Sequence, residues 1–202
     1  MTMDLQMRAE RKIQDIIEAA VNLFLQYSAK KTRMEDIAKE ANASKVTVYK
    51  YFVDKATLSQ QVFAHITGSY IKNLECLASE DTSLADRMIR FTLIATEWIS
   101  SGHQSLCEEL ACLSANVRRS YASLTQMQSQ QLLNLIREGK VEHLIQTGLD
   151  DEVVFHYINM GLCYYRNDAS YRLKVEHDVR FRQHFMSLLW CNILNGNPPF
   201  QA

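Results

Sequence analysis

Proline and glycine are scarce in this chain of 202 residues, which holds two prolines and six glycines. Both prolines, Pro198 and Pro199, lie near the C-terminus. Because proline and glycine are the residues that most disfavour helix interiors, almost all of the preceding chain is free to be helical. Long apolar runs are also missing, since nowhere do eighteen apolar residues follow one another. We therefore expect an all-α protein without a membrane span.

Cysteine is present in an odd number, five, with no regular spacing. This pattern argues against a secreted disulfide scaffold and favours a reducing compartment, so we expect a cytoplasmic protein. The first residues, M-T-M-D-L-Q-M-R-A-E-R-K, are charged early and carry no apolar stretch of signal-peptide length. A net charge of −1 argues against a protein that coats nucleic acid without selectivity. Residues 1–55 nevertheless carry ten Lys or Arg against eight Asp or Glu.

The most informative pattern lies between Met34 and Lys55. Small apolar residues recur there at helical spacing, at Ile37, Ala38 and Ala41. Asn42 follows, and asparagine enters the left-handed region more cheaply than most residues, as a helix-ending turn requires. Ser44 can then cap a second helix, whose buried side would consist of Val48 and Phe52. Two short helices joined by a tight turn are typical of a helix-turn-helix DNA-binding motif.

The outward side of the second helix carries side chains suited to DNA. They are Lys45, Thr47, Lys50 and Tyr51. Lysine neutralises phosphate or reaches guanine edges, threonine offers a hydroxyl and a methyl group, and tyrosine can bond phosphate. The alternative is an ordinary helical hairpin with a charged and solvated outer face.

The N-terminal region resembles the TetR (tetracycline-repressor-like) family over about its first 60 residues. The residues that carry the resemblance are Ile13, Ile16, Ile17, Ala19, Ala20, Leu23, Phe24, Ile37, Ala38, Ser44, Lys45, Thr47, Tyr49, Tyr51, Phe52 and Lys55. The chain departs from the family pattern at several positions. One is Ser28, which stands near where the family often ends its first helix with glycine. Asn42 replaces the usual glycine of the turn, Val46 stands where a small residue is common, and Val53 stands where proline often follows the phenylalanine.

The resemblance implies a set of DNA-binding residues. Thr32 or Arg33 would touch a phosphate near the start of the first short helix, and Tyr49 and Lys55 would clamp phosphates. The residues facing the major groove would be Lys45, Val46, Thr47, Lys50 and Tyr51. Independent support for Lys55 comes from Asp54, which can cap the helix that begins there and so place free backbone N–H groups near a DNA strand.

We expect two domains: residues 1–68 as a three-helix DNA-binding head with its helix-turn-helix motif at about 32–51, and residues 69–202 as a helical effector-binding and dimerisation body. Expected helices outside the motif cover about 8–27, 55 to beyond 74, 84–101, 104–116, 120–138, 151–167 and 176–195. Acidic residues at 150–152 suit the start of the penultimate helix.

In this family the last two helices would form a four-helix bundle with their copies in a second subunit. The dimerisation candidates are Val154, Ile158, Gly161, Leu162, Phe181, Phe185, Leu188 and Leu189. The alternative is that these stripes serve the core of one protomer. A cavity between body helices would hold a small-molecule effector, expected to be apolar or aromatic, and its candidate lining residues are Phe91, Trp98, Tyr121, Phe155 and Tyr164.

No metal, cofactor or catalytic residue is expected. His103 and Cys107 share a helix face, but two ligands are too few for a closed zinc site and Cys112 lies off that face. The chain has no phosphate loop, no nucleophile elbow and no paired metal-binding helices.

We expect a non-enzymatic regulator, most simply a repressor, that binds a palindromic operator in double-stranded DNA as a homodimer and is released by its effector. The alternatives are an all-α dimeric small-molecule-binding protein or enzyme, and a protein-binding adaptor, whose head does not read DNA.

Overall fold

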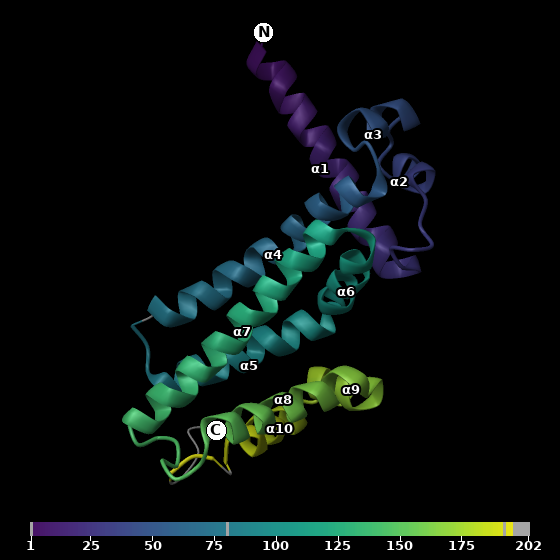
Figure 1. Ribbon diagram of the computed structural model, residues 1–202. Helices are drawn as coiled ribbons and strands as arrows, with labels where there is room; N and C mark the ends of the chain where they lie inside the picture. Colours follow the sequence, from purple (N-terminus) through teal and green to yellow (C-terminus); the bar gives the residue numbers. More distant parts are fainter. Residues whose placement is uncertain (1, 80, 192, 196–202) are drawn as a thin grey trace. The chain divides into compact units, whose positions relative to one another are not determined.

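The computed structural model describes residues 2–79, 81–191 and 193–195 (Figure 1). These residues form ten α-helices and no β-strand. The helices are α1 (Thr2–Tyr27), α2 (Met34–Glu40), α3 (Lys45–Tyr51), α4 (Lys55–Ser79), α5 (Leu84–Ser100), α6 (His103–Leu113), α7 (Ala115–Val141), α8 (Asp151–Asn167), α9 (Ala169–His177) and α10 (Val179–Cys191). The all-α prediction is confirmed. Within the described ranges, no helix has the length and apolar character needed to cross a membrane.

The chain forms two compact units. The first consists of Met1–Ile71 and Gly102–Leu124, and the second of Lys72–Ser101 and Thr125–Ala202. Helices α4 and α7 are each divided between the two units. The expected domain boundary at residue 68 remains a prediction. By their contacts, α6 and the start of α7 belong to the first unit.

The first unit is built on an apolar face of α1. Ile16, Ala20 and Phe24 recur at intervals of four, and each is at most 2% exposed, so this stripe faces the interior. Helix α1 packs against α2, and α2 packs against α3, as Figure 1 shows in purple and dark blue. The buried residues opposite α1 include Ile37, Ala38, Val48, Phe52, Leu58 and Val62. This arrangement is the three-helix head expected from the sequence.

The second unit buries apolar stripes of α5, α7, α8 and α10. Trp190 of α10 is fully buried, and its indole N–H donates to the hydroxyl of Thr92 on α5 at 3.2 Å. The α7–α8 connection is fixed by Lys140, whose ammonium group donates to Asp151 Oδ1 at 2.6 Å. Asn195 then donates its side-chain amide to the carbonyl groups of His143 and Ile145, at 3.0 and 3.2 Å. The end of the described chain is thus tied to this connection.

Several helix boundaries were predicted from local signals. The prediction of 151–167 coincides with α8, where Asp150 accepts hydrogen bonds from the backbone N–H groups of Glu152 and Val153. The prediction of a single last helix over 176–195 is wrong. Asp168 caps α9 by accepting from Tyr171 N, and Asp178 caps α10 by accepting from Phe181 N. These two aspartates start separate helices, because a side-chain oxygen at this position bonds the free N–H groups of a new first turn. Helix α10 also ends earlier, at Cys191.

Two helical glycines give a matched test of packing at the α7 end. A Cβ atom at Gly139 would lie 2.7 Å from Ile145 Cδ1 and 2.8 Å from its Cγ1, whereas one at Gly68 would meet nothing within 4 Å. We expect Gly68→Ala to raise the free energy of unfolding by up to about 1 kcal/mol through helix propensity. Gly139→Ala should lower it by about 1–2 kcal/mol, because crowding against buried Ile145 outweighs that gain. Urea unfolding followed by circular dichroism measures both, and equal stabilisation would contradict the crowding.

Candidate nucleic-acid interface

The turn between α2 and α3 has the geometry expected from its sequence. Asn42 adopts a positive φ of 46°, and Ala43 N donates to the carbonyl of Ala38 at 2.8 Å, which closes the end of α2. Ser44 then caps α3, because its hydroxyl oxygen accepts from Thr47 N at 3.0 Å. Sequence reasoning missed one support of this turn, Lys12 of α1, whose ammonium group donates to the carbonyl of Ala41 at 2.8 Å.

Helix α3 buries one side and presents the other to solvent. Val48 is fully buried. On the outer side Lys45, Val46, Tyr49 and Lys50 are exposed, while Thr47 and Tyr51 are half-buried. We name the six residues of α3 other than Val48 the α3 outer face. The face combines two cations with two aromatic hydroxyls, which can bond phosphates and base edges.

Two cations of this face lie against aromatic rings of the same helix. Lys45 Nζ lies 5.7 Å from the centroid of the Tyr49 ring, and Lys50 Nζ lies 5.7 Å from that of Tyr51. Lys45 also forms an ion pair with Glu35 of α2, with 2.5 Å between Nζ and Oε1. The hydrogen bond between them lowers the pKa of Glu35 and raises the pKa of Lys45, so both groups stay charged at neutral pH.

The two residues expected to touch a phosphate before α2 differ in accessibility. Thr32 is only 5% exposed, and its hydroxyl donates to the carbonyl of Ser28 at 3.0 Å. Arg33 is exposed, and its backbone N–H donates to Asp36 Oδ2 at 3.0 Å. Arg33 is therefore the more accessible member of the pair, and a phosphate contact by either residue remains a prediction.

Lys55 has a structural role that the sequence did not reveal. Its ammonium group donates to the carbonyl of Thr32 at 2.7 Å and to that of Lys30 at 3.2 Å, and it lies 5.8 Å from the Phe24 ring centroid. Burial lowers its pKa. Asp54 caps α4 as predicted, accepting from Thr57 N at 2.7 Å. With two of its three N–H donors directed to the chain, Lys55 holds the α1–α2 connection.

The same connection is held from α6. Glu109 Oε2 accepts from Ser28 Oγ at 2.8 Å and from Ala29 N at 2.7 Å. Ser28 itself has a φ of 79°, a left-handed conformation that ends α1. Sequence reasoning missed Glu109, because it lies 80 residues from Ala29 and no local pattern connects the two.

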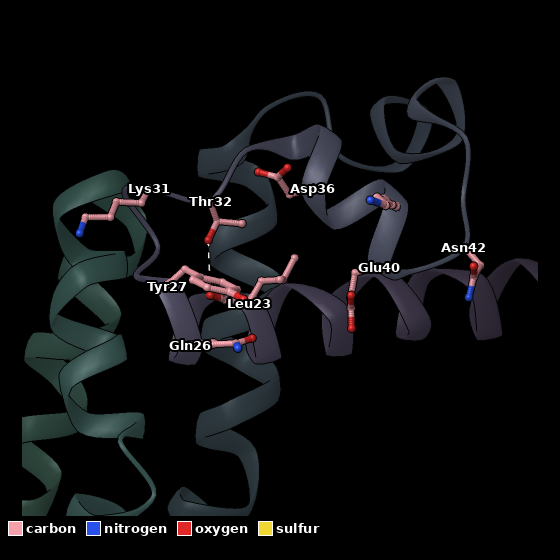
Figure 2. A pocket seen from close by; sticks show the side chains of 9 residues that line it. Leu23, Gln26, Tyr27, Lys31, Thr32, Asp36, Glu40 and Asn42 are labelled. Carbon is pink, nitrogen blue, oxygen red and sulfur yellow. Dashed lines mark hydrogen bonds between the residues drawn. The ribbon is translucent and has the colours of Figure 1, made fainter.

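A concavity of about 800 Å³ lies beside the α1–α2 connection. Figure 2 shows side chains of α1 and α2 around it, with the hydroxyl of Thr32 directed to the carbonyl of Leu23 at 3.4 Å. The lining residues are Leu23, Gln26, Tyr27, Lys31, Thr32, Asp36, Lys39, Glu40 and Asn42. Two lysines and two carboxylates balance the charge of this lining, so it does not select a ligand of one sign.

Comparison with known proteins decides the family. Residues 16–62, from α1 into α4, match the family model of bacterial regulatory proteins, tetR family. This match places the DNA-binding domain of the chain in the tetR family. The match includes α2, the turn and α3, so this tetR-family protein is a DNA-binding transcriptional regulator with a helix-turn-helix domain. No curated protein matches the sequence.

Solved structures share the fold of this tetR-family chain. A TetR family protein from Vibrio parahaemolyticus superimposes with a TM-score of 0.65 at 20% identity, covering 92% of this chain and 100% of that one. FadR from Bacillus subtilis in complex with stearoyl-CoA superimposes with a TM-score of 0.64 at 19% identity, covering 89% of this chain and 98% of that one. The ketosteroid transcriptional regulator KstR2 of Mycobacterium tuberculosis superimposes with a TM-score of 0.68 at 16% identity, covering 91% of this chain and 95% of that one. The fold thus extends over both units of this chain.

The effector candidates do not gather in one unit of the tetR-family chain. Tyr121 belongs to the first unit and the other four to the second. Phe91 and Trp98 are buried at 1% and 6% exposure, and Phe155 is half-buried. Tyr164 is 56% exposed, and its hydroxyl donates to Asp168 at 3.0 Å. Their role in effector binding remains a prediction.

Most dimerisation candidates lie in the interior of the second unit. Val154, Ile158, Leu162, Phe185 and Leu189 are at most 6% exposed, and Phe181 is half-buried. A Cβ atom at Gly161 would lie 2.6 Å from Leu189 Cδ1, so this glycine permits close packing of α8 on α10 within the protomer. Leu188 is the exception at 64% exposure. This burial is what the alternative, a protomer core, requires.

Neither the cysteines nor the histidines of the described residues form a metal site. No group of three or more His, Cys, Asp or Glu side chains there could hold a metal ion. Burial raises the pKa of Cys107 to about 12 and lowers the pKa of His103. A thiol with so high a pKa is a poor nucleophile and a poor metal ligand at neutral pH.

Proposed function

We propose that this regulator is a homodimeric repressor that binds a palindromic operator and releases it when a small molecule binds the body. The observation that carries the proposal is the α3 outer face, which is capped at Ser44 and exposes cations and aromatic hydroxyls. A helix of this kind enters the major groove in helix-turn-helix proteins. The proposed DNA contacts are Thr32, Arg33, Lys45, Val46, Thr47, Tyr49, Lys50, Tyr51 and Lys55.

Selection of bound sequences from random duplex DNA tests this proposal. The purified chain is incubated with the duplex pool at physiological salt, and the bound fraction is amplified and sequenced. An enriched palindrome supports a dimer that reads two half-sites. Weak, salt-sensitive binding without enrichment would contradict sequence-specific regulation by the protein alone.

Substitutions on the α3 outer face should separate positioning from base recognition. Tyr49→Phe removes a hydroxyl that we assign to a phosphate, so it should weaken operator and random duplex alike, by about tenfold. Lys45→Ala and Thr47→Ala should instead change the ranking of sequences, because both side chains are assigned to base edges. Affinities for the enriched operator and for single-base variants measure the difference. Equal losses on every sequence for all three variants would contradict these roles.

A second copy of the chain is the proposed partner of an apolar surface on α8 and α10. Val153, Met160 and Tyr164 are 61%, 64% and 56% exposed, and their spacing of seven and four places them on one face of α8. Tyr157 lies on the same face, and its hydroxyl donates to the carbonyl of Leu188 at 3.1 Å, which brings α10 alongside. We name Val153, Met160, Tyr164 and Leu188 the α8–α10 patch. A self-complementary patch of this kind suits a two-fold dimer.

The proposed effector is apolar or aromatic, and it would bind in the body near Phe91, Trp98, Tyr121, Phe155 or Tyr164. The name of the FadR structure includes stearoyl-CoA and that of KstR2 a ketosteroid, both of which contain large apolar groups. An effector can release DNA only if it binds better to a conformation that does not fit the operator. Titration of operator complexes with long-chain acyl-CoA and steroid panels tests the proposal, and release should follow the affinity of each compound for the free protein.

A further inference from the structure

The ion pair between α2 and α3 places a carboxylate on the surface that the proposed function assigns to DNA. Glu35 Oε1 lies 2.5 Å from Lys45 Nζ. The side chains of Glu35 and Lys45 are 49% and 61% exposed, so both can be reached by a ligand. Lys45 is the first residue of α3, and N-terminal residues of a recognition helix contact base edges. A carboxylate bonded to Lys45 must accompany it into the groove or separate from it.

The pair offers a hydrogen-bond donor and an acceptor side by side. The ammonium group of Lys45 has three N–H donors, of which one is directed to Glu35, so two remain. The carboxylate of Glu35 has lone pairs left beyond that bond. In the major groove a G·C pair presents the N7 and O6 acceptors of guanine next to the N4 amino donor of cytosine. Lys45 matches the guanine edge, and Glu35 matches the amino group of cytosine.

An A·T pair matches the same two side chains less well. In adenine the N7 acceptor lies beside the N6 amino group. A carboxylate that accepts from N6 therefore also faces the lone pair of N7, which repels it. Thymine offers one acceptor, O4, in place of the two on guanine. Resting on the proposed function, we propose that Glu35 is a specificity-determining residue and that the Lys45–Glu35 pair reads one G·C base pair in each half-site.

Sequence selection with the full chain tests this. Wild type, Glu35→Gln and Glu40→Gln are compared on the same random duplex pool at one salt concentration. Glu40→Gln is a matched control, because it removes the same charge from the other end of α2. We expect the wild type and the control to enrich a G·C pair at one shared half-site position. For Glu35→Gln we expect the preference for cytosine at that position to fall by about tenfold. Adenine should be accepted there as well, because an amide side chain pairs well with adenine, and the preferences at other positions should not change.

Affinities in a Lys45→Ala background complete the design. There, Glu35→Gln should have a smaller effect on that position, since the two side chains act as a pair. A uniform rise in affinity with unchanged ranking would overturn the proposal, because Glu35 would then act only as a charge that repels phosphate. Unchanged ranking and affinity would overturn it as well. Failure of the wild type to enrich any sequence would instead overturn the proposed function, and this inference with it.

Discussion

Leu188→Glu should leave the protein monomeric and lower its affinity for a palindromic operator by about 100-fold or more. Leu188 belongs to the α8–α10 patch and is 64% exposed, so the substitution does not disturb the core of the protomer. The bond from the Tyr157 hydroxyl uses the backbone carbonyl of Leu188 and is retained. In a two-fold dimer each patch meets its own copy, so the variant would bury two like charges close together.

The expected loss on DNA follows from the geometry of two half-sites. A dimer binds its second half-site without a further loss of translational freedom, whereas a monomer binds each half-site independently. Leu173→Glu is a matched control, because Leu173 is also exposed, at 54%, but lies on α9 outside the patch. Sedimentation velocity gives the mass, and titration of a palindrome and of a single half-site gives the affinities. A dimeric Leu188→Glu variant would contradict the α8–α10 patch as the interface.

Local signals explain why the helix-turn-helix motif could be predicted so fully. Asn42, Ser44 and Asp54 each act within a few residues of their own position, as a left-handed turn residue or as a cap. Such roles depend on the side chain and its immediate backbone, so the sequence alone indicates them. Asp150 sets the start of α8 in the same way.

Contacts between distant parts of the chain could not be predicted in this way. Lys12 bonds Ala41 across 29 residues, Lys55 bonds Thr32 across 23, and Glu109 bonds Ala29 across 80. Nothing in the local pattern distinguishes these charged side chains from solvated ones. Lys55 was predicted as a phosphate contact, and in the structure it also secures the segment before α2.

Periodicity alone also left the partner of an apolar face undetermined. The stripe of Val154, Ile158 and Leu162 is evident from its spacing, but spacing does not say whether the stripe packs on the same protomer or on a second one. In the structure these three residues are at most 6% exposed within one protomer. The exposed face of α8, with Val153 and Met160, is interrupted by polar residues and is therefore less evident from the sequence.

Trp190→Ala should have the largest effect on stability, lowering the free energy of unfolding by about 3–5 kcal/mol. Trp190 is fully buried, and its removal would leave a cavity lined by the core of the second unit. The change also removes the hydrogen bond from its indole N–H to Thr92 Oγ1. For a chain of this size such a loss corresponds to a fall in Tm of about 10 °C.

Two further variants separate the cavity from the hydrogen bond. Trp190→Phe keeps an aromatic ring but not the N–H, and Thr92 keeps its own donor bond to the carbonyl of Met88, so the loss should be about 1–2 kcal/mol. Thr92→Val leaves the buried indole N–H without its acceptor, and should cost a similar amount. The double variant Thr92→Val with Trp190→Phe should then lose less stability than the sum of the two single losses, because it leaves no buried polar group without a hydrogen-bond partner. Urea unfolding at one protein concentration, followed by circular dichroism, measures all four proteins. Additive losses would show that the Trp190–Thr92 bond contributes no coupling between α5 and α10.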